Sequence, residues 1–187
     1  MLISREKRDK NYAEYILYMW QVEDLIRANN CDISQIKKTI IPQYETGMDD
    51  ETKLELVDWW DNLAEMMKIE KKEKSGHLQI LINSVNEMNH FHSQLLSSTQ
   101  HLDYQMKFSS VLPMINELKT KIKPEPQNDI EAMLTVIYLS IMMKIKGDKI
   151  TDSTNQAIKV FSEVLALLSK LYKDDEEGKI EWNLNEN

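Results

Sequence analysis

The sequence contains few glycines, prolines and cysteines. Among 187 residues there are four Gly, four Pro and one Cys. A β-rich domain of this length uses many more glycines and prolines in its hairpin turns, so their scarcity favours helices. Because Cys31 is alone, the chain forms no internal disulfide and no zinc site built on several cysteines. This points to a reducing compartment.

The sequence also lacks a basic surface and a long apolar run. The net charge is −8, from 31 acidic and 23 basic residues. The basic clusters at 5–10 and 68–74 contain acidic residues too, so we interpret them as solvated helix ends and expect no nucleic-acid partner. The longest nearly uncharged run, 132–143, is far short of the roughly 20 residues that cross a bilayer. The N-terminus has no apolar core typical of a signal peptide. We expect a cytoplasmic protein without a membrane partner.

Apolar residues recur at helical spacing in six or seven segments. Gly47, Gly76, Gly147 and Gly178 each fall where such a segment stops, as helix C-terminal caps do. We expect Asp32 with Gln35, Asp49 or Asp50, Asp129, and Thr151 or Asp152 to begin helices. The predicted helices cover about residues 4–29, 33–41, 49–74, 78–95, 108–122, 129–146 and 151–172.

Two of these segments carry the fold prediction. Leu78, Leu81, Val85, Met88, His92 and Leu95 are spaced alternately by three and four, which predicts a bundle helix. The segment 129–146 is apolar nearly all round, so it lies inside a bundle or under a partner. The sequence therefore predicts an all-α, single-domain bundle of six or seven mostly antiparallel helices over 1–178. A possible internal break lies at 123–128, and 179–187 form a tail that is docked or disordered.

Three stretches of the sequence are similar to a known family. They are AEYILYMWQVEDLIRA at 13–28, KSGHLQI at 74–80 and LLSKLYKDDEEGK at 167–179. Together they resemble a domain-of-unknown-function family of about this length, known mainly from Bacteroides and related bacteria. The resemblance implies a bacterial cytoplasmic protein with no assigned activity. It brings no catalytic residues, so the chemistry must be argued from the residues themselves.

The first predicted helix carries a charged and aromatic constellation. Glu14, Tyr15, Tyr18, Glu23 and Arg27 lie on an otherwise apolar segment. A charge buried there needs a partner. We favour a polar anchor that ties this helix to a basic residue elsewhere. The alternative is a pocket that these residues line together with Trp20 and that holds a small cationic or polar ligand.

A second candidate site is a metal-binding pair. Glu87 and His90 form the Glu-x-x-His spacing that di-iron bundles use twice, because residues three apart share a helix face. The sequence contains this motif once only, so we regard a metal site as the weakest possibility and expect no cofactor.

Interface candidates are a histidine on the seam and a tryptophan pair. His92 lies on the predicted seam, where it is more typical of a core or interface than of a metal site. Trp59 and Trp60 are adjacent, so only one can point squarely into a narrow core and the other is expected at its margin.

Function is predicted mainly from these apolar surfaces. The sequence contains no phosphate-binding glycine loop, no nucleophile motif and no activated cysteine, so no catalytic residue is assigned. Eleven methionines suit adaptable apolar surface. We expect a non-enzymatic protein that binds a protein partner or self-associates. The alternative is a small-ligand- or metal-binding helical bundle, with or without enzymatic activity, built on carboxylates and histidine inside the bundle.

Overall fold

The computed structural model describes residues 2–180 and 182, apart from the side chains of residues 2 and 3. Within this part the protein is all-helical, as predicted, and has eight α-helices and one 3-10 helix. The expected count was six or seven. In chain order they are α1 (Leu2–Lys10), α2 (Tyr12–Ala28), α3 (Ile33–Thr39), η1 (Ile41–Gln43), α4 (Asp50–Ile69), α5 (Gln79–Ser97), α6 (Leu102–Lys119), α7 (Asp129–Lys146) and α8 (Asp152–Glu176).

The chain divides into two compact units. Unit 1 comprises Met1–Arg8 and Glu14–Asn83, and unit 2 comprises Asp9–Ala13 and Ser84–Asn187. The chain passes between the units within α1, α2 and α5, whereas the expected break at 123–128 lies inside unit 2. A single domain is one that folds as one unit, which this division by contacts does not test. The predicted single domain therefore stays a prediction, as does the predicted antiparallel bundle.

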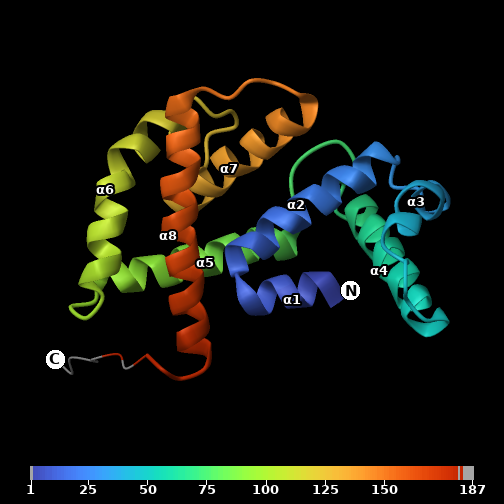
Figure 1. Ribbon diagram of the computed structural model, residues 1–187, viewed down its shortest axis with the longest axis horizontal. Coiled ribbons are helices and arrows are strands. Elements are labelled where there is room, and N and C mark those ends of the chain that lie inside the picture. The colour runs from blue at the N-terminus through green and yellow to red at the C-terminus, as the bar shows by residue number, and fades with distance from the viewer. Residues whose placement is uncertain (1, 181, 183–187) are drawn as a thin grey trace. The chain divides into compact units, whose positions relative to one another are not determined.

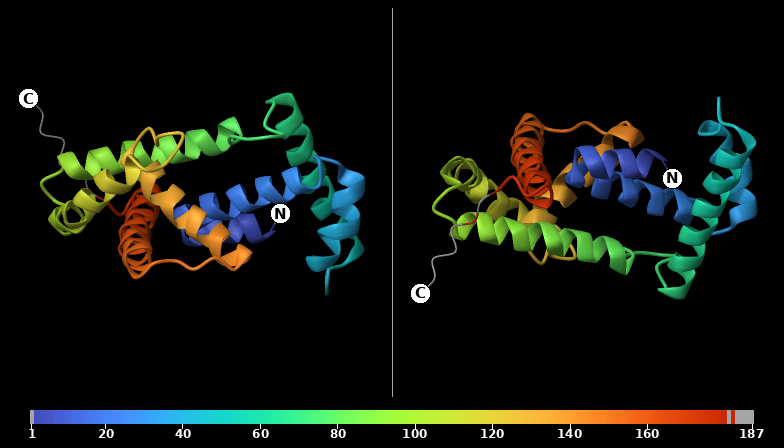
Figure 2. Two further views of the ribbon diagram at one scale, coloured as in Figure 1. Left: turned by 90° about the horizontal axis from the view of Figure 1, so that it is seen from above. Right: turned by 90° about the horizontal axis from the view of Figure 1, so that it is seen from below.

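In unit 1, the short helix α3 packs against α4 (Figure 2). Asp32 caps α3 by accepting a hydrogen bond from the Ser34 amide, and Asp49 caps α4 through the Thr52 amide. Both caps were predicted. Helix α4 ends at Ile69, five residues before the expected end. The core of this unit contains the fully buried side chains of Ile16, Ile26, Ile36, Trp60, Met67, Leu78 and Leu81.

The extra helix arises from a break that the sequence pattern did not predict. We expected one helix over 4–29, but Asn11 separates α1 from α2. The Ala13 amide, at the start of α2, donates to Ser169 Oγ of α8 at 3.1 Å. The Tyr12 ring stacks on Tyr172, with ring centroids 5.1 Å apart. A new helix start is therefore stabilised by residues more than 150 positions away, which local periodicity does not reveal.

In unit 2, helices α6, α7 and α8 pack on one another (Figure 1). Val85, Met88, His92 and Leu95 of the predicted seam belong to this unit, whereas Leu78 and Leu81 belong to unit 1. All six residues are buried, as the seam predicted. Helix α7 is capped by Asn128, which accepts from the Glu131 amide, and not by Asp129 as expected. Thr151 caps α8 through the Thr154 amide. Pro113 lies inside α6.

The C-terminal tail contacts unit 2 through its tryptophan. Trp182 Nε1 donates to Asp175 Oδ1 at 2.6 Å, and its ring lies edge-on to those of Phe91 and His101. Position 181 and positions 183–187 of the predicted tail lie outside the described residues. No helix of the described chain has the length and apolar character needed to cross a bilayer.

The burial of His92 leads us to expect a stability that depends on pH. Its side chain is buried, its Nδ1 lies 2.6 Å from the Tyr104 hydroxyl, and its ring lies edge-on to Phe108. Burial lowers the pKa of His92, and Asp129 opposes this shift. The unfolded chain therefore binds a proton at a higher pH than the folded chain does. Stability from this source is complete above about pH 6.5, the pKa of an unperturbed histidine, and is lost as the pH falls further.

We predict that H92Q makes the free energy of unfolding less dependent on pH between about pH 7 and pH 5. One histidine accounts for at most about 1.4 kcal/mol per pH unit. Urea unfolding at several pH values measures this slope. The control H90Q removes an exposed histidine and should keep the wild-type slope. A wild-type slope in H92Q would contradict the assignment.

Candidate functional site

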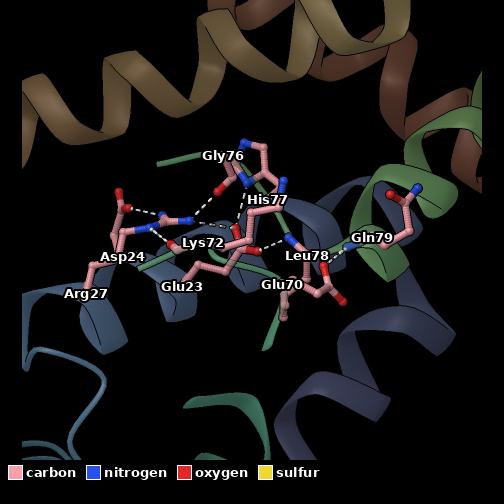
Figure 3. A network of polar contacts seen from close by, with 9 residues as sticks. All are labelled: Glu23, Asp24, Arg27, Glu70, Lys72, Gly76, His77, Leu78 and Gln79. Carbon is pink, nitrogen blue, oxygen red and sulfur yellow. Dashed lines mark hydrogen bonds and ion pairs between the residues drawn. The ribbon is translucent and has the colours of Figure 1, made fainter. Parts of the chain in front are cut away.

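The centre of the candidate site is a buried carboxylate near the end of α2. Glu23 is 1% exposed. Its Oε1 accepts a hydrogen bond from the Leu78 amide at 2.7 Å, and its Oε2 lies 2.6 Å from His77 Nδ1 (Figure 3). Both oxygens are thus satisfied, as a buried charge requires.

The partners of Glu23 come from the segment that joins α4 to α5. The His77 ring stacks on Trp20 of α2, with centroids 4.4 Å apart and planes 17° from parallel. Before it, Gly76 has a φ of +83°, a left-handed conformation that glycine adopts without a steric cost. The turn at Gly76 thus places His77 and Leu78 side by side on Glu23.

Carboxylates accept the first amide hydrogens of α5. Glu23 accepts from Leu78, and Glu70 Oε2 accepts from the Gln79 amide at 2.7 Å (Figure 3). The first amides of a helix have no partner within the helix, and the helix dipole favours negative charge there. Two acidic side chains, one on α2 and one directly after α4, therefore stabilise the start of α5.

Arg27 binds the backbone of the same connecting segment. Its Nε donates to the Lys72 carbonyl at 3.0 Å, and a terminal nitrogen donates to the Gly76 carbonyl. The other terminal nitrogen forms an ion pair with Asp24 at 2.6 Å, and the guanidinium lies 4.0 Å from Glu23. The planar guanidinium suits this use because its donors point in fixed directions. Together Glu23 and Arg27 hold the α4–α5 connection against α2.

The five predicted ligand-binding residues do not all meet. Glu14 is exposed and lies 3.8 Å from Lys7 of α1, whose Nζ is also 5.7 Å from the centroid of the Tyr18 ring. Burial raises the pKa values of Tyr15 and Tyr18, so both hydroxyls are neutral. Glu23 and Arg27 instead contact the α4–α5 connection. The predicted anchor had a basic residue elsewhere in the chain as its partner, whereas the partners of Glu23 are a histidine and a backbone amide.

Sequence reasoning missed His77 and Glu70 as partners in this site. His77 lies 54 positions from Glu23, and no local spacing relates them. The one signal was the stretch KSGHLQI, in which a turn glycine precedes a histidine and an apolar helix.

The predicted metal pair lies on the exposed side of α5. Glu87 Oε2 accepts a hydrogen bond from the Tyr12 hydroxyl at 3.0 Å, while His90 is exposed. Burial and the neighbouring Glu87 raise the pKa of Tyr12 to about 12, so this hydroxyl stays a donor. Among the described residues, no group of three or more His, Cys, Asp or Glu side chains could hold a metal ion.

The predicted interface residues lie mainly inside the protein. Trp60 is fully buried and Trp59 is half-buried. Their rings lie edge-on to each other, with centroids 5.2 Å apart. His92 belongs to the core of unit 2. Cys31 is buried, and burial raises the pKa of its thiol, which disfavours the reactive thiolate.

These observations define an all-helical protein whose most elaborate polar site is a structural anchor. Over residues 1–179 the chain matches the family model of a domain of unknown function, DUF4924, and it belongs to this family. No curated protein and no solved structure matches it.

We predict that E23A lowers the free energy of unfolding by about 1–3 kcal/mol, because it leaves the buried Leu78 amide and His77 without their acceptor. E23Q should cost less, since its amide oxygen can still accept from Leu78. Urea unfolding measures both values. The exposed control E14Q should stay within about 0.5 kcal/mol of wild type. Equal stability of E23A and E14Q would show that Glu23 is not an anchor.

Proposed function

We propose that the protein acts by binding a helical segment of a protein partner rather than by catalysing a reaction. The docking surface, called here the end of α7, consists of the exposed apolar residues Leu139 and Met143 with Lys144 and Lys146 of α7 and Lys149 of the loop that follows. We further propose the cytoplasm as its compartment, because a lone cysteine suits a reducing environment.

The observation that carries this proposal is the uneven burial of α7. Its first half contributes Ile130, Met133 and Leu134 to the core, all fully buried. Toward its end, Leu139 is 46%, Met143 38% and Ile145 71% exposed. Figure 1 shows the end of α7 diverging from α8, which starts after the loop that follows. Apolar residues that continue along a helix beyond its buried part are typical of a docking site.

The charges at this end indicate the chemistry of the partner. Lys144, Lys146 and Lys149 are exposed, and none forms an ion pair within the described part of the chain. Leu139 and Met143 are four positions apart and so lie on one side of the helix. Apolar side chains flanked by free positive charges suit an amphipathic helix with acidic and apolar residues on one face.

The alternative, a small-ligand site around Glu23, has less support. The oxygens of Glu23 and the donors of Arg27 already bind protein groups. A ligand would have to displace these buried contacts at considerable cost.

We predict that a labelled helical peptide with leucines and glutamates on one face binds the protein, and that the same peptide with lysines in place of glutamates binds at least tenfold more weakly. The variant L139S/M143S should weaken binding of the acidic peptide about tenfold or more, because one buried leucine contributes about 1.5–3 kcal/mol. Fluorescence anisotropy measures the dissociation constants.

The matched control is L102S/M106S, which changes another exposed pair with the same spacing on α6. It should leave peptide binding unchanged. If L139S/M143S unfolds, L139S alone serves instead, since Leu139 is the more exposed of the two. No binding of the acidic peptide, or equal binding of both peptides, would contradict the proposal.

A further inference from the structure

The protein itself carries a surface with the chemistry expected of the partner. The α4 face, defined as Glu51, Leu54, Glu55 and Asp58, follows the spacing i, i+3, i+4, i+7 and so occupies one side of the helix. Leu54 is 66% exposed, and the three acidic residues around it are exposed as well. The result is an acidic stripe with a leucine at its centre.

The carboxylates of the α4 face form no ion pair with another described residue. The ion pairs on this helix join Lys53 to Asp50 and Lys68 to Glu65. Glu51, Glu55 and Asp58 take part in no ion pair with another described residue. Three acidic side chains on one face repel one another unless a positive surface neutralises them.

We infer that the partner bound at the end of α7 is a second copy of this chain, which docks there through its α4 face. This inference rests on the proposed function and names its partner. The lysines at the end of α7 meet Glu51, Glu55 and Asp58, and Leu54 packs on the apolar residues between the lysines. Two different surfaces meet, so one copy contributes α4 and its neighbour contributes α7.

Charge decides the pairing of these surfaces. The chain carries a net charge of −8, so two copies repel each other at most orientations. The end of α7, with three lysines and one acidic residue over 144–149, is a local exception. Electrostatic attraction therefore selects the contact of α4 with α7, and added salt weakens it.

The inference is tested by sedimentation velocity of the full chain from about 1 µM to about 1 mM, the range of weak to moderate association. Wild type should shift from monomer to larger species as its concentration rises, and less so at high salt. E55K/D58K reverses two of the negative charges on the α4 face, and K144E/K146E reverses two of the positive charges at the end of α7. Each variant alone should remain monomeric.

A mixture of the two variants gives the decisive result. E55K/D58K keeps its α7 lysines and K144E/K146E keeps its α4 carboxylates, so together they should form a 1:1 complex at least tenfold tighter than either variant with itself. The control E125K/E176K matches the charge change on α4. The control K37E/K38E reverses two exposed lysines in the last turn of α3 and so matches the change on α7. Both controls should associate like wild type.

Three outcomes would overturn the inference. They are a wild-type chain that stays monomeric, single-surface variants that associate like wild type, and a mixture that does not associate. Binding of the acidic peptide by a strictly monomeric chain would leave the proposed function standing with a foreign partner. If the chain neither self-associates nor binds the acidic peptide, the proposed function is contradicted as well.

Discussion

The carboxylate of Glu23 lies in the interior of unit 1, where it is stable only because each of its oxygens has a partner. Those partners, His77 and the Leu78 amide, belong to the connection between α4 and α5. Arg27 binds the backbone of the same connection at Lys72 and Gly76. The path of the chain from α4 into α5 thus depends on two charged residues one helical turn apart on α2. Both oxygens of Glu23 and three nitrogens of Arg27 are thus bound to other groups of unit 1.

Much of the helical architecture could be predicted from local sequence. The spacing of apolar residues from Leu78 to Leu95 indicated a buried face, and all six seam residues are buried. Gly76 and Gly147, placed after periodic segments, have positive φ values. These features depend on neighbours within one or two turns, which a sequence shows directly.

What could not be predicted depends on contacts between distant residues. The break between α1 and α2 is stabilised by Ser169 and Tyr172 of α8. In the candidate site, an anchor involving Glu23 was predicted, but His77 as its partner was not. No rule of helical spacing relates positions 54 residues apart.

Helix α7 connects the fold to the proposed function. It is apolar nearly all round, yet its core contacts end before its sequence pattern does, which leaves Leu139, Met143 and Ile145 exposed among lysines. Exposing these apolar side chains to water is unfavourable in free energy. A docked partner would bury them and remove that penalty.

Hydrogen–deuterium exchange of the full chain at low and high protein concentration tests this account most directly. We expect exchange to slow with rising concentration at 139–149, which comprise the end of α7 and the start of the loop after it, and at 51–58 on α4. Each surface covers the other between copies. Exchange that is independent of concentration at both segments, or that slows only elsewhere, would contradict it.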